Sequence, residues 1–364
     1  MTEQMRAWTF SQRGRAQDVL TLGSIPKPTI TSPDQVLIKV ACTSLFSSYK
    51  AIMALLPVSA GQKRIPEAEF SGEIVEYGEN VREELKVPGL AVFGLTLPME
   101  PKTDLLRFMR NPNGTLTEYV VVRQNLIVAK PANMSLEAAS GMAGIGATAV
   151  QFADAAKLNT GDYVLVNGGS GAVGMLLLQL LKKIVGPEGK VVATCSGSKK
   201  DVVLQYADEA IDYRAHAPVH TYLAQEYGTR KFDAIIDAGC TQELYDHSPD
   251  YLNEGKRFLD MSAKHPIGRG WQYSDLLPLI ANQMKNNFWP TLLGGVPRKY
   301  IFISGTPDYK TLQKIRELIE DGTFKGTIDS VYGMDEVIQA YDRFSGPDAR
   351  GRVVVDVRRD RLHA

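Results

Sequence analysis

A glycine-rich turn between a strand pattern and a helix pattern constrains the fold of this chain most. The apolar run Tyr163–Asn167 leads into the turn, and the helical run Met175–Lys183 follows it. Glycine permits a tight turn that a pyrophosphate can approach, and a helix start offers free N–H groups and a partial positive charge. The spacing therefore predicts a dinucleotide-binding turn. Its residues are Gly169, Ser170, Gly171, Ala172, Val173 and Gly174, in a G-x-G-x-x-G pattern.

Strand and helix patterns alternate around and after this turn. Five more strands are expected beyond Tyr163–Asn167: Lys190–Thr194, Glu209–Ile211, Asp233–Asp237, Arg257–Met261 and Tyr300–Ser304. One helix is expected over Ala172–Ile184, and another from Ser135, a suitable N-cap, to about Leu158. Such alternation predicts a parallel sheet with helices on both faces.

The first 128 residues show a different pattern, in which Gly and Pro separate short β-branched or aromatic runs. Strands are expected at Arg6–Phe10, Gln35–Ala41, Phe70–Tyr77, Leu90–Gly94 and Glu118–Val122. Many short strands with such turns predict a sandwich or a partly open barrel. The end of the chain adds helices at Lys310–Asp321 and Met334–Phe344 and a last strand at Arg352–Val357.

Composition narrows the functional classes. Lys and Arg total 41, which equals Asp and Glu at 41, so no basic excess indicates nucleic-acid binding. The three cysteines, Cys42, Cys195 and Cys240, are too few and too far apart for a disulfide scaffold. No apolar run approaches the roughly 20 residues that cross a bilayer, and the start lacks the apolar core of a signal peptide. We expect a cytoplasmic protein of two domains without stable membrane insertion.

The residues after the second strand of the dinucleotide unit indicate which cofactor binds. An NAD site usually has an acid there to bond the ribose 2′-hydroxyl. This chain has Ser196, Ser198, Lys199 and Lys200 instead, and no acid before Asp201. Two hydroxyls and two lysines suit a 2′-phosphate, although the lysines would also suit the start of a solvated helix. We therefore predict NADPH rather than NADH.

Ligands for zinc are scarce. The first 215 residues contain no histidine, and Cys42 and Cys195 are their only thiols. His216 and His220 are four residues apart, but Pro218 lies between them and indicates a surface turn. We predict neither a catalytic nor a structural zinc ion.

The segment from Pro266 to Pro297 fits the alternation poorly. It is apolar and contains two internal prolines. A core or subunit-contact helix pair is the first interpretation. The second is a flap over an apolar pocket, or a surface that touches lipid.

Together, these motifs resemble the medium-chain dehydrogenase/reductase superfamily, and most closely its zinc-free, zeta-crystallin-like quinone oxidoreductase branch. Pro66-Glu-Ala-Glu-Phe-Ser-Gly72 and Val75-Glu-Tyr-Gly78 are similar to the branch's P-G-x-D-F-x-G and V-x-x-G. Further matches, in the same order, span nearly the whole chain: Val92–Leu95, Gly114–Tyr119, Lys130–Asn133, Gly146–Ala149, the glycine turn, Ala210–Tyr213 and Gly351–Val355.

The resemblance implies a Rossmann dinucleotide-binding domain, residues 129–305, inserted in a GroES-like β-barrel catalytic domain, residues 1–128 and 306–364. It implies hydride transfer from NADPH to an electron-poor C=C bond of an enone or enal, or to a quinone, and a homodimer. By position, Thr148 would lie near the nicotinamide, and Ser196, Ser198 and Lys199 near the 2′-phosphate. Tyr213 would flank the adenosine end, and Gly239 and Cys240 would line the ribose.

The chain differs from the branch pattern at positions that the resemblance links to polarisation of the substrate. The branch commonly has N-P-x-D after its third strand, and here Leu45 replaces the Asn and Ser48 the Asp. A tyrosine found later in some members is Leu56. With Phe46, Leu45 and Leu56 predict an apolar substrate pocket. Two catalytic candidates remain, Lys50 and Tyr49; some relatives have a lysine at the position of Lys50.

Lys50 would orient the cofactor or stabilise an enolate as charge develops on oxygen, unless it is a solvated helix residue. Tyr49 is the weaker candidate, as a proton donor. The alternatives are a non-catalytic NADPH-binding sensor or structural protein, and the same fold used for non-redox biosynthetic chemistry.

Overall fold

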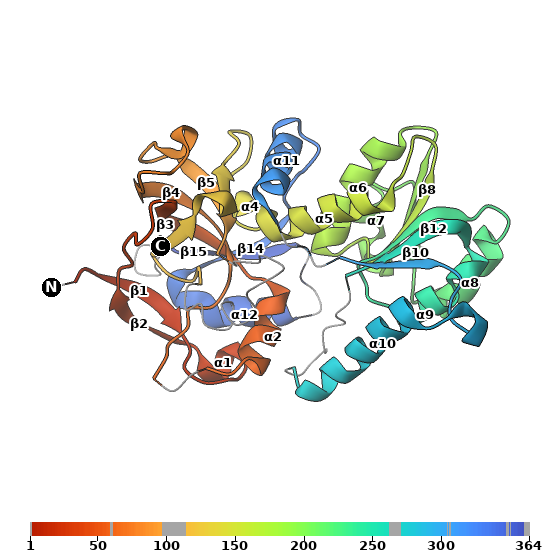
Figure 1. Cartoon of the computed structure of the whole chain (residues 1–364), viewed down its shortest axis with the longest axis horizontal. Coiled ribbons are helices and arrows are strands. Elements are labelled where there is room, and N and C mark those ends of the chain that lie inside the picture. The colour runs from red at the N-terminus through yellow and green to blue at the C-terminus, as the bar shows by residue number, and fades with distance from the viewer. Residues whose placement is uncertain are drawn as a thin grey trace. The chain divides into compact units, whose positions relative to one another are not determined.

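Contacts within the chain group its residues into two compact units, each with its own sheet (Figure 1). The computed structural model describes residues 2–58, 61–96, 114–261, 271–303, 305, 307–346, 349 and 351–359. The first unit comprises Met1–Ala147, Pro266–Gln272 and Thr306–Ala364, and the second Thr148–His265 and Tyr273–Gly305. Whereas we expected the first boundary at residue 128, the contacts divide the chain after Ala147, inside a helix.

The second unit contains a six-stranded sheet in which all neighbouring strands are parallel. Its order is β10-β9-β8-β11-β12-β13, which confirms the expected Rossmann arrangement. The inner strands are runs of Val, Ile, Leu and Ala that helices bury from both sides. The strands are β8 (Tyr163–Asn167), β9 (Lys190–Cys195), β10 (Glu209–Asp212), β11 (Phe232–Asp237), β12 (Leu252–Asp260) and β13 (Lys299–Phe302).

Helices cover both faces of this sheet. In Figure 1, α6 lies on one face and α9 on the other. The helices are α6 (Ala172–Val185), α7 (Lys200–Val203), α8 (Val219–Tyr227), α9 (Gln242–Asp246) and α10 (Leu276–Phe288). Short 3-10 turns are η3 (Gly197–Lys199), η4 (Ser248–Asp250), η5 (Tyr273–Asp275) and η6 (Thr291–Leu293).

The first unit joins the two ends of the chain in one seven-stranded sheet. The order is β14-β15-β3-β4-β5-β7, and β6 pairs with the other end of β3. The long strand β3 pairs with β15 through its last three residues, which is how the C-terminal strand enters the sheet. The strands are β3 (Gln35–Ser44), β4 (Glu69–Tyr77), β5 (Ala91–Leu95), β6 (Tyr119–Arg123), β7 (Ile127–Ala129), β14 (Ile328–Gly333) and β15 (Arg352–Asp356).

A separate hairpin and several helices complete this unit. The hairpin is β1 (Gln4–Thr9) against β2 (Thr21–Pro26). The helices are α1 (Ala16–Val19), α2 (Ser47–Leu55), α4 (Leu136–Ala139), α11 (Tyr309–Glu320) and α12 (Val337–Ser345), with α5 (Met142–Ala156) crossing the boundary between the units. The 3-10 turns are η1 (Glu83–Leu85), η2 (Gln124–Leu126) and η7 (Met334–Glu336).

The expected helix from Ser135 to Leu158 is broken into α4 and α5. Its N-cap is confirmed, because the Ser135 hydroxyl accepts a hydrogen bond from the Ala138 N–H at 3.2 Å. The break falls at Gly141, where an added Cβ would lie 2.6 Å from Nε of Arg352 and 2.8 Å from Oγ of Ser44. Glycine lets the backbone pack against these buried polar groups there.

The interpretation of residues 266–297 as a core helix pair is wrong for the described part, 271–297. One α-helix forms there, α10, and none of its residues is buried. Leu277, Ile280, Met284 and Phe288 recur at helical spacing and are all more than half exposed. Residues 266–270 lie outside the described residues. No helix in the described part of the chain combines the length and apolar character that crossing a bilayer requires.

Candidate cofactor and catalytic sites

The glycine turn between β8 and α6 has the geometry of a pyrophosphate cradle. Gly168 adopts the left-handed conformation, with φ of 77°. Its N–H donates to the Thr194 hydroxyl at 3.0 Å, and the Gly169 N–H donates to the Thr194 carbonyl at 2.9 Å. A Cβ on Gly174 would lie 2.3 Å from the Gly168 carbonyl oxygen, so the start of α6 packs directly on the turn.

The N-terminus of α6 is available to an anion. Its N-cap residue is Gly171, and no side chain caps it. The first-turn N–H groups and the helix dipole therefore favour a phosphate at this place. The turn residues Gly169–Gly174 fit the pyrophosphate of a dinucleotide, as the sequence predicts.

The residues predicted to lie near the 2′-phosphate and the adenosine gather at the carboxyl ends of β9 and β10. Ser196 follows β9, and its hydroxyl lies 3.4 Å from that of Ser198 in η3, which ends at Lys199. The Tyr213 N–H donates to the Cys195 carbonyl at 3.1 Å, which brings Tyr213 beside the same turn. Its ring is partly exposed, with the Arg214 guanidinium 5.6 Å from the ring centroid.

Asp212 is a residue of this cluster that sequence reasoning missed. It pairs with Cys195 across β10 and β9, and a Cβ on Gly197 would lie 2.4 Å from its Oδ2. Its carboxylate therefore faces the turn that holds Ser196 and Lys199. The sequence signal was the acid directly before Tyr213, in register with the end of β9.

A buried network of hydrogen bonds around Asp237 adjoins the glycine cradle. Asp237, at the end of β11, accepts hydrogen bonds from the Asn167 amide at 2.7 Å, the Gly239 N–H at 2.9 Å and the Thr241 N–H at 2.7 Å. Burial, followed by the neighbouring Asp260 carboxyl, raises the pKa of Asp237 to about 7, although these hydrogen bonds oppose the shift. The network ties the ends of β8 and β11 together.

The other predicted cofactor residues of this unit lie at the same edge of the sheet or beside it. Cys240 follows Gly239 with φ of 57°, and a Cβ on Gly168 would lie 3.0 Å from the Gly239 N. The loop after β11 thus adjoins the glycine turn. Thr148 is buried, and a Cβ on Gly305 would lie 2.3 Å from its hydroxyl.

The two catalytic candidates lie on α2 in the first unit. Lys50 is half-buried, and its Nζ donates to the Ser345 hydroxyl at 3.2 Å and lies 5.3 Å from the ring centroid of Phe344. Burial lowers the pKa of Lys50, which the nearby Glu67 carboxylate opposes. Tyr49 is buried, and desolvation raises its pKa, so its phenol keeps its proton at neutral pH.

Sequence reasoning missed two buried glutamates beside α2. Glu69 of β4 forms an ion pair with Arg352 and accepts a hydrogen bond from the Gly144 N–H. Glu67 is fully buried and has φ of 69°, a left-handed conformation that costs a non-glycine residue about 1–2 kcal/mol. Burial raises the pKa of Glu67 to about 8. The signal was a glutamate in the place of the glycine in P-G-x-D-F-x-G.

The three apolar pocket candidates surround the same helix but differ in burial. Leu45 is fully buried, and its N–H donates to the Val353 carbonyl at 3.0 Å. Phe46 and Leu56 flank α2 at its two ends and are partly exposed. The structure thus brings Leu45, Phe46, Tyr49 and Lys50 into one neighbourhood. A substrate pocket lined by Leu45, Phe46 and Leu56 stays a prediction.

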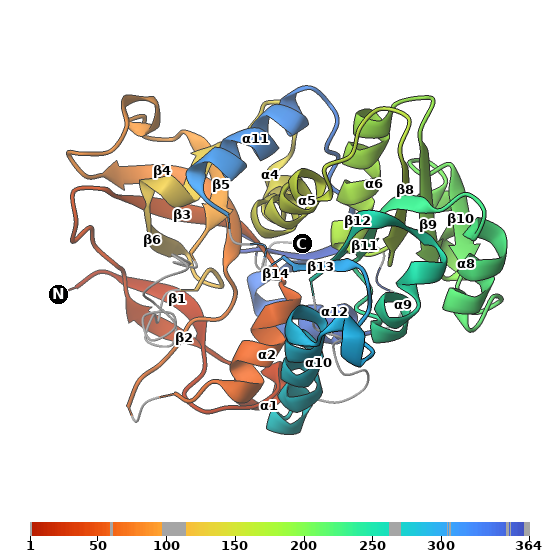
Figure 2. The same cartoon turned by 45° about the vertical axis from the view of Figure 1, so that its right-hand side comes forward.

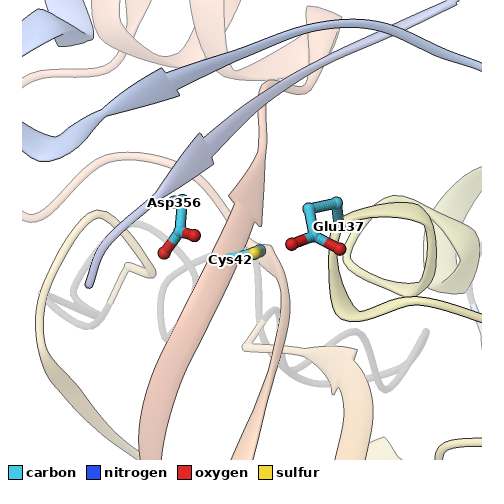
Figure 3. Close-up of side chains that lie close together, drawn as sticks. All are labelled: Cys42, Glu137 and Asp356. Atoms are coloured by element: carbon cyan, nitrogen blue, oxygen red, sulfur yellow. The ribbon is translucent and has the colours of Figure 1, made fainter. Parts of the chain in front are cut away.

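One group of possible metal ligands occurs in the described residues, and its members belong to β3, α4 and β15. Cys42, Glu137 and Asp356 point toward one another, with ligand atoms within 4.8 Å (Figure 3). Burial, with the two carboxylates, raises the pKa of the Cys42 thiol to about 12. The Arg358 guanidinium bonds Asp356 at 3.0 Å and lies 3.8 Å from Glu137. A protonated thiol and two acids that share a guanidinium suit a metal poorly.

The second unit has a Rossmann sheet with a glycine cradle, and the first is a barrel-like unit built from both chain ends. A chain that contains both defines a nucleotide-dependent dehydrogenase or reductase. Residues 205–355 match the family model described as zinc-binding dehydrogenase. The trans-enoyl reductase poxH of Penicillium oxalicum is 34% identical, with 99% of each chain covered. The medium chain reductase pydE of an Acremonium species is 32% identical, with 98% of this chain and 100% of that protein covered.

The chain belongs to the medium-chain dehydrogenase/reductase superfamily and to its quinone oxidoreductase-like branch. This is a family of oxidoreductases and implies a nicotinamide cofactor. Solved structures share the fold. The quinone oxidoreductase of Coxiella burnetii superposes with a TM-score of 0.73 at 21% identity, covering 98% of this chain and 100% of its own. That of Pseudomonas syringae gives a TM-score of 0.74 at 18% identity, covering 97% and 100%.

Proposed function

We propose that the protein is an NADPH-dependent reductase that transfers hydride to an electron-poor C=C bond of an apolar enone or enal, or to a quinone. The observation that carries the proposal is a glycine cradle followed by Ser196, Ser198 and Lys199, in a chain whose relatives include trans-enoyl reductases. A lysine and two hydroxyls suit a 2′-phosphate through charge-assisted hydrogen bonds. The bound nicotinamide supplies the hydride.

The chain's own residues would stabilise the negative charge that develops on the substrate and supply the proton that it takes up. Hydride addition at the β-carbon of an enone shifts an electron pair onto the carbonyl oxygen. In this proposal the Lys50 ammonium stabilises that oxygen, and a proton then adds at the α-carbon. Tyr49 keeps its phenol proton at neutral pH and is the candidate proton donor, a weaker assignment than that of Lys50.

The decisive experiment measures NADPH consumption with a panel of enones, enals and quinones, and runs the same panel with NADH. We expect turnover with NADPH and at least one apolar acceptor. Lys50→Ala should lower kcat by roughly tenfold or more, and by more than Tyr49→Phe does. If Tyr49→Phe were inactive while Lys50→Ala turned over like the unaltered protein, Tyr49 rather than Lys50 would be the more important catalytic residue.

A second candidate is a protein that binds NADPH without turning it over. Its support is the replacement of the branch's Asn and Asp by Leu45 and Ser48, of which Leu45 is fully buried. Such a protein would show a thermal shift with NADPH and no consumption of it with any acceptor. Non-redox biosynthetic chemistry would instead convert a substrate while the NADPH absorbance stays constant.

We also propose that the enzyme works without zinc, as a cytoplasmic homodimer. The zinc proposal rests on the poor match of Cys42, Glu137 and Asp356 to a metal site, within the described residues. The dimer is what membership of this branch implies. Light scattering at several protein concentrations measures the mass that tests it.

A further inference from the structure

Glu67 departs from the family pattern at a position where the backbone favours glycine. The pattern P-G-x-D-F-x-G has glycine there, and this chain keeps the left-handed conformation, with φ of 69°, while carrying a glutamate. A side chain that persists in a strained conformation indicates that its own contacts matter.

Both oxygens of Glu67 are engaged, and they connect two helices. Oε1 accepts a hydrogen bond from the Tyr341 hydroxyl of α12 at 2.5 Å. Oε2 accepts one from the N–H of Phe46, the residue that precedes α2, at 2.8 Å. The nearby Arg352 guanidinium bonds Ser44 and Glu69 instead, so no hydrogen-bonded cation among the described residues neutralises Glu67.

The same face of α12 also holds Lys50. Tyr341, Phe344 and Ser345 are spaced i, i+3 and i+4, so they share one face of α12. Tyr341 donates a hydrogen bond to Glu67, while Phe344 and Ser345, on the same face, contact the Lys50 ammonium. Figures 1 and 2 show α2 and α12 in the same unit. The two helices are therefore joined at Glu67 and again at Lys50.

We propose that Glu67 is a positioning residue for Lys50: its buried carboxyl group fixes α2 against α12 and so holds the Lys50 ammonium beside Ser345 and Phe344. This inference deepens the proposed function and rests on it for the role of Lys50 in turnover. The positioning itself does not require that the protein reduce anything.

The effect of the Glu67 charge on the pKa of Lys50 supports the same positioning role. Burial lowers the pKa of Lys50, and the charge on Glu67 opposes that shift. Glu67 itself has a pKa raised to about 8, so its support for Lys50 grows as the pH rises through that value. The titratable and charged groups around Glu67 come from α2, α12, β4, β15 and the segment before β4; they are Tyr49, Lys50, Tyr341, Glu69, Arg352 and Arg64.

The test is a pH titration of the Lys50 ammonium, followed by NMR in protein with ¹³C-labelled lysine and assigned with Lys50→Arg. Glu67→Gln removes the charge at nearly the same shape. We expect its Lys50 to lose the proton about one pH unit earlier than in the unaltered protein. Glu73→Gln, on the exposed side of β4, is the matched control and should leave the Lys50 titration unchanged.

A second variant protects the test against a folding failure. Glu67→Gly restores the pattern's glycine, relieves the left-handed strain and also removes the carboxylate. It should shift the Lys50 titration in the same direction. An unchanged Lys50 titration in both Glu67 variants would overturn the inference.

Activity separates this inference from the proposed function. If the protein turns over enones or quinones, the basic limb of its kcat/KM profile should move to lower pH in Glu67→Gln by the same interval. A shifted Lys50 titration in a protein without turnover would overturn the proposed function and leave the positioning role standing.

Discussion

Lys199 is the residue whose charge most directly tests the cofactor. A charge-assisted hydrogen bond to a 2′-phosphate contributes roughly 1.5–3 kcal/mol, which is about ten- to a hundredfold in affinity. Lys199→Glu should therefore weaken NADPH binding by that factor and leave NADH nearly unaffected. Dissociation constants for both cofactors, at one ionic strength, measure it.

Lys183→Glu is the control for this change, because Lys183 is exposed in the last turn of α6, away from the cradle at the start of that helix. It should leave both constants unchanged. Ser196→Asp should go further than Lys199→Glu, since its carboxylate would join that of Asp212, repel a phosphate and offer an acceptor to a free 2′-hydroxyl. Equal losses for NADPH and NADH would show that the ribose end lies elsewhere.

The raised pKa of Asp237 predicts that the free energy of unfolding depends on pH. Its pKa is raised to about 7 in the folded protein, against an ordinary value of 3.8. Between these values the unfolded chain has released the proton and the folded chain still holds it. The free energy of unfolding therefore falls as the pH rises through this window, by at most about 1.4 kcal/mol per pH unit.

Asp237→Asn removes that titration. The difference in unfolding free energy between the unaltered protein and Asp237→Asn should fall from about pH 4 to pH 7 and stay level above it. Asp154→Asn, on the exposed face of α5, should run parallel to the unaltered protein throughout. A difference that rises with pH would mean that Asp237 is ionised in the fold.

At the scale of elements, α10 and α11 differ in the burial of their apolar side chains. Leu277, Ile280 and Met284 of α10 are exposed, whereas Leu312 and Ile315 of α11 are fully buried. Each Leu, Ile or Met to Ser change on α10 should alter the unfolding free energy by less than about 0.5 kcal/mol. Leu312→Ala should cost about 2–5 kcal/mol.

Denaturant unfolding of single variants measures both effects. A large loss on changing Leu277, Ile280 or Met284 would mean that this face is covered in the assembled protein. The subunit-contact interpretation of residues 266–297 would then hold for the part that includes α10.

At the scale of the whole molecule, the two units contain different sets of candidate site residues. The second contains the glycine cradle and the residues predicted to lie near the 2′-phosphate, and the first contains Lys50, Tyr49 and the glutamates beside α2. The family model's description mentions zinc, so metal dependence is the property of the whole enzyme most worth measuring.

Exhaustive dialysis against a chelator should leave both the melting temperature and the turnover unchanged. The reason is that the described residues offer one poor ligand group, in which Arg358 already contacts both acids. Elemental analysis before and after dialysis gives the zinc content. About one zinc per chain, lost together with activity, would contradict the prediction.

The parallel sheet and the glycine cradle could be predicted from the sequence because their signals are local. A strand, a turn and a helix stand next to one another from Tyr163 to Val185. The alternation of strand and helix patterns along the chain predicts that the strands run parallel. The cluster of Ser196, Ser198 and Lys199 could be found for the same reason. Asp212 was missed because its place beside Gly197 depends on the register of β10 against β9.

The break at Gly141, the exposure of α10 and the surroundings of Lys50 were decided by tertiary structure. Hydrophobic periodicity shows which face of a helix is apolar, but it does not show whether another element covers that face. Glu67 meets Tyr341 across 274 residues, and Lys50 meets Ser345 across 295. Because the pairing of β15 with β3 joins the two ends of the chain, residues that no local pattern connects become neighbours.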